Sequence, residues 1–158
     1  MSKIEIKEAI RKLNDEEVVA LPTETVYGLA ARCDSEEALG KIFSTKKRPF
    51  FDPLILHVQN LHQAEGYGFF DSISRSLAEE FWPGALTLVL RKTERVSPLV
   101  NNGGETVALR SPQHPLFLEV LQATKVPLAA PSANLFGKTS PTNAEHVIKE
   151  FNSLVPVL

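Results

Sequence analysis

The stretch Val18-Val-Ala-Leu-Pro-Thr-Glu-Thr-Val-Tyr-Gly28 joins a short, β-branched apolar run to a proline and a polar loop. The apolar run, residues 18–21, predicts a buried strand that stops at Pro22, because proline cannot donate to a strand ladder. Ligands of open α/β sheets collect beyond the carboxyl ends of the strands. The loop over residues 22–28 is therefore a natural place to look for a ligand site.

On both sides of this stretch, helical and extended patterns alternate along the chain. The first dozen residues show apolar spacing typical of an amphipathic helix, and Ser35 is a suitable N-cap for a second helix that ends near Lys46. Further helices are expected over 72–81, from Pro115, and over 143–151, and further strands over 53–58, 85–90, 106–110 and 127–130. This alternation favours an α/β sheet with helices packed on it.

The bulk properties describe one ordinary globular domain. A chain of 158 residues can bury one core, and a net charge of −2 argues against a surface that binds nucleic acid everywhere, although a local basic cleft is compatible with it. No apolar run approaches the roughly 20 residues of a membrane span, and no signal-peptide pattern begins the chain. Cys33 is the only cysteine, which excludes an internal disulfide. We expect a cytoplasmic protein without a membrane contact.

Polar side chains follow several predicted strands. Thr23, Glu24 and Thr25 follow the first strand, His57 and Arg110 end two others, and Ser132 and Asn134 follow a fourth. We expect these groups to converge at one edge of the sheet. Each also has a plain structural interpretation. A buried histidine can be a satisfied core residue, an arginine can be a solvated strand-end charge, and Ser132, Asn134 and Ser140 are common turn and cap residues.

Two cations, Lys46 and Arg48, flank Lys47 between a helix end and a strand, where they could reach phosphate oxygens. Cations at a helix C-terminus are also favoured by the helix dipole, by about 0.3–1 kcal/mol each. The sequence contains no Walker A loop, His-Glu-x-x-His, Gly-x-Gly-x-x-Gly or Gly-x-Ser-x-Gly motif. P-loop kinases, metalloproteases, dinucleotide oxidoreductases and α/β-hydrolases thereby lose their main sequence support.

Six segments, taken in order, resemble the YrdC-like family, the threonylcarbamoyl-AMP synthases. They are Pro22-Thr-Glu-Thr-Val-Tyr-Gly-Leu29, Lys46-Lys-Arg-Pro49, Pro53-Leu-Ile-Leu-His57, Trp82-Pro-Gly-Ala-Leu-Thr87, Val107-Ala-Leu-Arg110 and Pro131-Ser-Ala-Asn134. The resemblance implies a YrdC-like domain over residues 8–158. Residues 154–158 read as the beginning of a strand, so we expect this domain to be truncated at its C-terminal end.

The resemblance implies an α/β fold with a twisted, open mixed β-sheet, flanking helices and a concave, positively charged cleft. It also implies an enzyme, a nucleotidyltransferase. The implied reaction joins L-threonine, bicarbonate and ATP into threonylcarbamoyl-AMP and releases pyrophosphate, as the first step of threonylcarbamoyladenosine modification of tRNA. A threonylcarbamoyl transferase complex is the implied partner, with an RNA or tRNA contact left open.

By the same resemblance, the site residues fall into two groups. The expected ATP-binding residues are Lys46, Arg48, Asp52, Thr106, Ser132, Asn134 and Ser140, with Lys46 and Arg48 as the catalytic cations. The expected threonine-binding residues are Thr25, His57, Arg110 and the backbone of Ala130, and the planar guanidinium of Arg110 suits a bidentate grip on a carboxylate. No residues are assigned to a resident metal, and Mg²⁺ is expected to arrive with the nucleotide.

The sequence departs from the family pattern at Asp52, where the family usually has asparagine. A carboxylate beside the ATP phosphates needs a neutralising partner, and Lys47 and Mg²⁺ are the two candidates that the sequence suggests. Two other functions stay open. One is an RNA-binding module of the same fold without catalysis. The other is a carbamoyltransferase-type domain of hydrogenase-maturation proteins, which is expected to have acylphosphatase and zinc-finger segments as neighbours.

Overall fold

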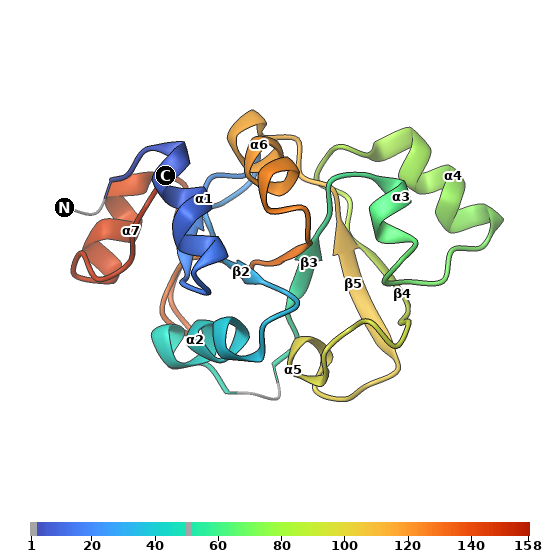
Figure 1. Ribbon diagram of the computed structural model, residues 1–158, viewed down its shortest axis with the longest axis horizontal. Coiled ribbons are helices and arrows are strands. Elements are labelled where there is room, and N and C mark those ends of the chain that lie inside the picture. Colours follow the sequence, from blue (N-terminus) through green and yellow to red (C-terminus); the bar gives the residue numbers. More distant parts are fainter. Residues whose placement is uncertain (1–2, 50–51) are drawn as a thin grey trace.

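The computed structural model describes residues 3–49 and 52–158, and its centre is a six-stranded sheet with the order β1-β2-β6-β3-β5-β4 (Figure 1). The strands are β1 (Val19–Leu21), β2 (Gly28–Arg32), β3 (Ile55–His57), β4 (Leu88–Arg91), β5 (Thr106–Arg110) and β6 (Leu128–Ala129). β3 and β5 are parallel, and the other neighbouring pairs are antiparallel. The prediction of a mixed sheet is therefore confirmed.

Helices cover both faces of the sheet (Figure 1). The helices are α1 (Ile6–Asn14), α2 (Glu36–Lys46), α3 (Leu61–Ala64), α4 (Ser72–Phe81), α5 (Pro98–Asn101), α6 (Pro115–Thr124) and α7 (Ala144–Glu150). One buried cluster joins α1 and α6 to the sheet, and a second joins α2, α3, α5 and α7 to its opposite face. Successive side chains of β2 alternate between these clusters, with Ala30 in the first and Leu29 and Ala31 in the second.

Most predicted elements form close to their expected bounds. The predictions for α4 and β5 are confirmed residue for residue, and Ser35 caps α2 by accepting from the backbone N–H of Ala38 at 3.1 Å. The strand expected from Ala85 starts only at Leu88. The turn before it is hydrogen-bonded outside the strand ladder, since the N–H of Gly84 donates to the carbonyl of Ser111. The strand expected at residues 154–158 is reduced to isolated bridges that Val157 makes with Lys3 and Ala20.

The sequence patterns missed three elements. β2 starts at a glycine and is rich in alanine, so it lacks the β-branched residues that mark strands. α3 and α5 have four residues each, too few to show a helical period. No helix in the described parts of the chain combines the length and apolar character that a membrane crossing needs.

Two features of the sheet position the site. β3 and β5 run in parallel with His57 opposite Arg110, so their carboxyl ends meet at the same edge. Backbone hydrogen bonds also join the segment after β1 to the segment after β6. The N–H of Leu29 donates to Pro131 at 2.8 Å, and the N–H of Ala133 donates to Tyr27 at 2.7 Å. Residues far apart in the sequence therefore meet at one edge.

Candidate functional site

A cavity of about 300 Å³ lies at this edge of the sheet. It is lined by Thr23, Val26, Gly28, Arg48, Pro53, Ile55, His57, Arg110, Ala130, Pro131 and Ser132. These residues come from β2, from the ends of β3 and β5, and from the loops after β1, α2 and β6. Of the polar groups expected to converge, Thr23, His57, Arg110 and Ser132 line this cavity, whereas Glu24, Thr25 and Asn134 do not.

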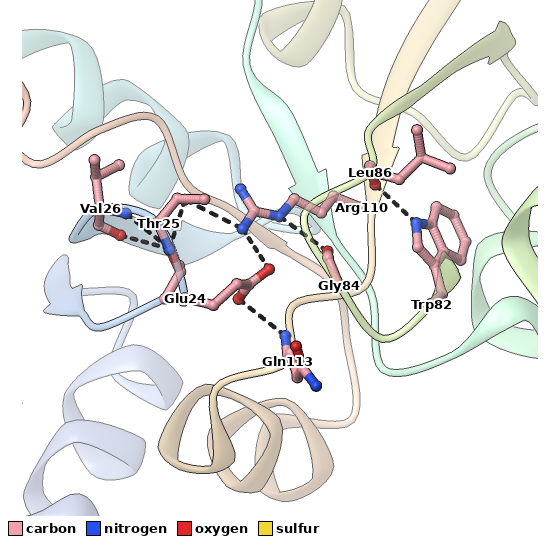
Figure 2. A network of polar contacts seen from close by, with 9 residues as sticks. Glu24, Thr25, Val26, Trp82, Gly84, Leu86, Arg110 and Gln113 are labelled. Carbon is pink, nitrogen blue, oxygen red and sulfur yellow. Dashed lines mark hydrogen bonds and ion pairs between the residues drawn. The ribbon is translucent and has the colours of Figure 1, made fainter. Parts of the chain in front are cut away.

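Arg110 is the most constrained cation of the cavity, with 9% of its surface exposed. Figure 2 shows its contacts: Nη2 donates to Glu24 Oε1 at 2.5 Å and to Thr25 Oγ1 at 3.2 Å, and Nε donates to the carbonyl of Gly84 at 3.3 Å. Nη1 has no hydrogen-bond partner among the described residues. Bidentate binding of a carboxylate would need two donor nitrogens of Arg110, but Nη2 and Nε already donate to protein groups. This leaves Nη1 for a ligand.

Glu24 joins Arg110 to the start of α6. Its Oε2 accepts from the backbone N–H of Gln113 at 3.0 Å, so each carboxylate oxygen has a partner (Figure 2). Glu24 as a whole residue is exposed, whereas the side chain of Glu24 is only 20% exposed. Burial alone raises the pKa of this carboxyl, but the hydrogen bond from Arg110 and those from the backbone outweigh it and hold the pKa below its usual value. Glu24 is therefore ionised at neutral pH.

His57 is buried between the cavity and α6, with its ring stacked on Phe117 at 5.1 Å between centroids. Burial, followed by the charge of Arg110, lowers the pKa of His57 to about 4, so the imidazole is neutral at pH 7. Nδ1 of His57 and Nε of Arg48 are buried without a partner among the described residues. Buried polar atoms normally have hydrogen-bond partners, so both atoms suit contacts with a bound molecule.

Asp52 is neutralised by a residue that the sequence did not suggest. Its Oδ2 lies 2.9 Å from Nη2 of Arg48, which also donates to the carbonyl of Pro53 at 2.9 Å. Lys47, one of the two expected partners, is the exposed C-cap of α2, and the structure pairs Asp52 with Arg48 instead, whereas a contact of Asp52 with Mg²⁺ stays a prediction. Since both cavity arginines are paired with carboxylates, the positive charge of the cleft stays a prediction.

Lys46 lies beneath the loop after β6. It is 1% exposed, and its amine donates to the carbonyls of Ser132 and Asn134. Burial, followed by the charge of Arg48, lowers its pKa to about 8. Lys46 is the last residue of α2, and its side chain is buried. Its contact with phosphate stays a prediction.

A second cavity, of about 450 Å³, involves the next residues of the same loop. It is lined by Ala133, Asn134, Lys138, Thr139, Ser140, Pro141, His146, Lys149 and Glu150. The side-chain amide of Asn134 donates to the carbonyls of Leu135 and Lys138, which holds the loop closed on itself. The predicted ATP-binding residues are thus divided, with Arg48 and Ser132 at the first cavity and Asn134 and Ser140 at the second.

The remaining predicted residues differ in their placement. Ala130 lines the first cavity. Thr25 is not part of the lining, but its hydroxyl accepts a hydrogen bond from Arg110, which is. Thr106 is exposed at the amino end of β5, opposite Arg91, and lines neither cavity. Sequence reasoning missed the pairing of Glu24 with Arg110. The available signal was its position between two threonines directly after a buried strand, but no local pattern names its partner.

Comparisons with known proteins find relatives that cover most of the chain. The family model Sua5_yciO_yrdC, described as telomere recombination, matches residues 11–158. The chain is 46% identical over 153 residues to the threonylcarbamoyl-AMP synthase of Bacillus subtilis (strain 168), covering 96% of this chain and 44% of that protein. It is 44% identical over 140 residues to the threonylcarbamoyl-AMP synthase of Pyrococcus abyssi, covering 88% and 41%. The chain therefore spans less than half the length of these two relatives.

Solved structures show the same fold. The crystal structure of Pyrococcus abyssi Sua5 complexed with L-threonine matches with a TM-score of 0.93 and 40% identity, covering 98% of this chain and 47% of that chain. Full-length HypF in its phosphate- and nucleotide-bound form matches with a TM-score of 0.84 but only 17% identity, over 97% of this chain and 24% of that one. The likeness to HypF shows the fold alone.

Proposed function

The chain belongs to the Sua5/YciO/YrdC family, and from that premise we propose that it joins L-threonine, bicarbonate and ATP into threonylcarbamoyl-AMP and pyrophosphate. One observation carries the proposal. The cavity presents Nη1 of Arg110, which has no partner within residues 3–49 and 52–158, beside a neutral His57, in a fold that closely matches a Sua5 crystallised with L-threonine. An arginine N–H and a neutral imidazole suit the carboxylate and the hydroxyl or amine of an amino acid.

The proposed reaction needs no nucleophile from the protein. The amine of threonine captures bicarbonate with loss of water, a carbamate oxygen attacks the α-phosphorus of ATP, and pyrophosphate leaves. Holding three reactants in one cleft lowers the entropic part of the barrier, and cations stabilise charge on the transferring phosphoryl group. Thr25, His57, Arg110 and the backbone of Ala130 are the residues that we assign to threonine.

For ATP, we assign Arg48 and Ser132 at the first cavity and Asn134 and Ser140 at the second. Lys46 supports this nucleotide site because its amine donates to the carbonyls of Ser132 and Asn134, which belong to the loop between the two cavities. Magnesium arrives with the nucleotide. The product passes in the cytoplasm to a threonylcarbamoyl transferase complex that modifies tRNA.

The direct test is incubation of the chain with ATP, bicarbonate and labelled L-threonine. We expect a labelled adenylate and pyrophosphate that both require threonine and bicarbonate, and omission of either substrate is the control. Pyrophosphate release that does not depend on threonine would contradict the proposal. An RNA-binding module without catalysis would instead bind RNA in a salt-dependent manner and leave ATP unchanged.

Asp52→Asn is expected to tighten ATP binding about two- to fivefold, with or without magnesium, because it frees the charge of Arg48 from a partly exposed ion pair. Calorimetric titration with ATP measures this. The control is Asp34→Asn, which removes a similar pair with Arg32 outside both cavities. Weaker binding only in the presence of magnesium would mean that Asp52 holds the metal, and unchanged binding would mean that the pair does not limit Arg48.

A further inference from the structure

Each arginine of the first cavity is paired with a carboxylate, and neither carboxylate lines the cavity. The two pairs differ in what else they hold. Asp52 is contacted within its own loop, four residues from Arg48, whereas Glu24 reaches across 86 residues of sequence to Arg110 and also accepts from the backbone of Gln113. Glu24 therefore ties three separate segments together at the wall of the cavity.

We propose that Glu24 is a positioning residue, which holds Nη2 of Arg110 so that Nη1 faces the cavity and receives the carboxylate of the amino-acid substrate. This inference rests on the proposed function, since the substrate carboxylate is taken from it. Arg110 has a long, rotatable side chain that ends in a planar guanidinium, and three contacts fix the orientation of this group: Glu24, Thr25 and the carbonyl of Gly84 (Figure 2). Of these three, only Glu24 supplies a charge.

An alternative is that Glu24 occupies the position of the substrate carboxylate and is displaced when the substrate binds. The geometry argues against this alternative. A displaceable carboxylate would lie inside the cavity, but Glu24 is absent from its lining. Displacement would also release the N–H of Gln113, which Glu24 satisfies at the start of α6. Both oxygens of Glu24 are engaged, while Nη1 of Arg110 has no partner in the described parts of the chain, so a substrate carboxylate can bind without breaking the pair.

The test compares Glu24→Gln with the unchanged chain by calorimetric titration with L-threonine and, separately, with ATP. Glutamine keeps the length of the side chain and one acceptor oxygen but removes the charge. We expect threonine binding to weaken about tenfold, as a charge-assisted contact is replaced by a neutral one, and ATP binding to stay within about twofold. Glu8→Gln is the matched control, because it removes a similar carboxylate from an arginine pair on the exposed side of α1.

A second measurement follows Arg110 without any ligand. In ¹⁵N spectra, we expect the Nε–H of Arg110 to exchange slowly with solvent in the unchanged chain and in Glu8→Gln, and rapidly in Glu24→Gln. Equal protection in Glu24→Gln would overturn the positioning role. Tighter threonine binding by Glu24→Gln would show that Glu24 competes with the substrate and would also overturn it, as would unchanged binding.

The two measurements separate this inference from the proposed function. If the unchanged chain does not bind threonine, the proposed function fails, and the substrate part of the inference fails with it. If it binds threonine and Glu24→Gln binds equally well, only the positioning role fails. Melting temperatures of the variants show whether each is folded at the temperature of the titration.

Discussion

Arg110→Ala is expected to remove measurable binding of L-threonine. The substitution deletes a buried cavity cation, and Nη1 of Arg110 is the group that we assign to the substrate carboxylate. It also leaves Glu24 with only the N–H of Gln113, which should lower the free energy of unfolding by about 2 kcal/mol for this partly buried pair. Threonine titration and urea unfolding measure the two effects.

Arg110→Lys separates the loss of charge from the loss of shape. Lysine keeps the charge but cannot contact Glu24, Thr25 and Gly84 while presenting a further N–H to the cavity. We expect a folded protein whose threonine binding is weaker by about tenfold or more. Full threonine affinity in both variants would remove Arg110 from the site.

Lys46→Met is expected to lower the free energy of unfolding by about 2–3 kcal/mol, because the carbonyl of Asn134 loses the amine as its donor and that of Ser132 keeps only the N–H of Asn134. Methionine fills a similar volume, so the loss is not one of packing. Urea unfolding measures the change. The control is Lys41→Met on the same helix, where the lysine is more exposed and pairs with Glu17 and Glu37, and where we expect a clearly smaller loss. Equal losses would contradict the structural role of Lys46.

The stability of the protein should also respond to pH through Lys46. The folded chain releases the Lys46 proton at a pKa of about 8, whereas the unfolded chain keeps it up to the ordinary value of 10.5. The unfolded state binds more protons in this window, so stability should rise with pH from about 8. Burial raises the pKa of Cys33 to about 11, which acts in the opposite direction above its ordinary value of 9.0. Between pH 7.5 and 9, Lys46→Met should lack the rise that the unchanged chain shows.

Much of the fold was predictable because its signals are local. The spacing of apolar residues in α1, the N-cap Ser35 and the β-branched run before Pro22 each act within a few residues of the element they define. β2 escaped prediction because its glycine and alanines have low strand preference. It forms because its neighbours, β1 and β6, supply hydrogen-bonding partners on both sides.

The sequence by itself determined the α/β class, the order of most elements and the segments that carry the candidate site. Only the tertiary structure decided which groups pair there. It placed Glu24 on Arg110, Asp52 on Arg48 and the amine of Lys46 on carbonyls more than eighty residues away. Hydrogen bonds and ion pairs depend on distance and direction to within a few tenths of an ångström. For Glu24 and Lys46, that geometry is set by how the sheet brings distant strands together, and no local pattern contains it.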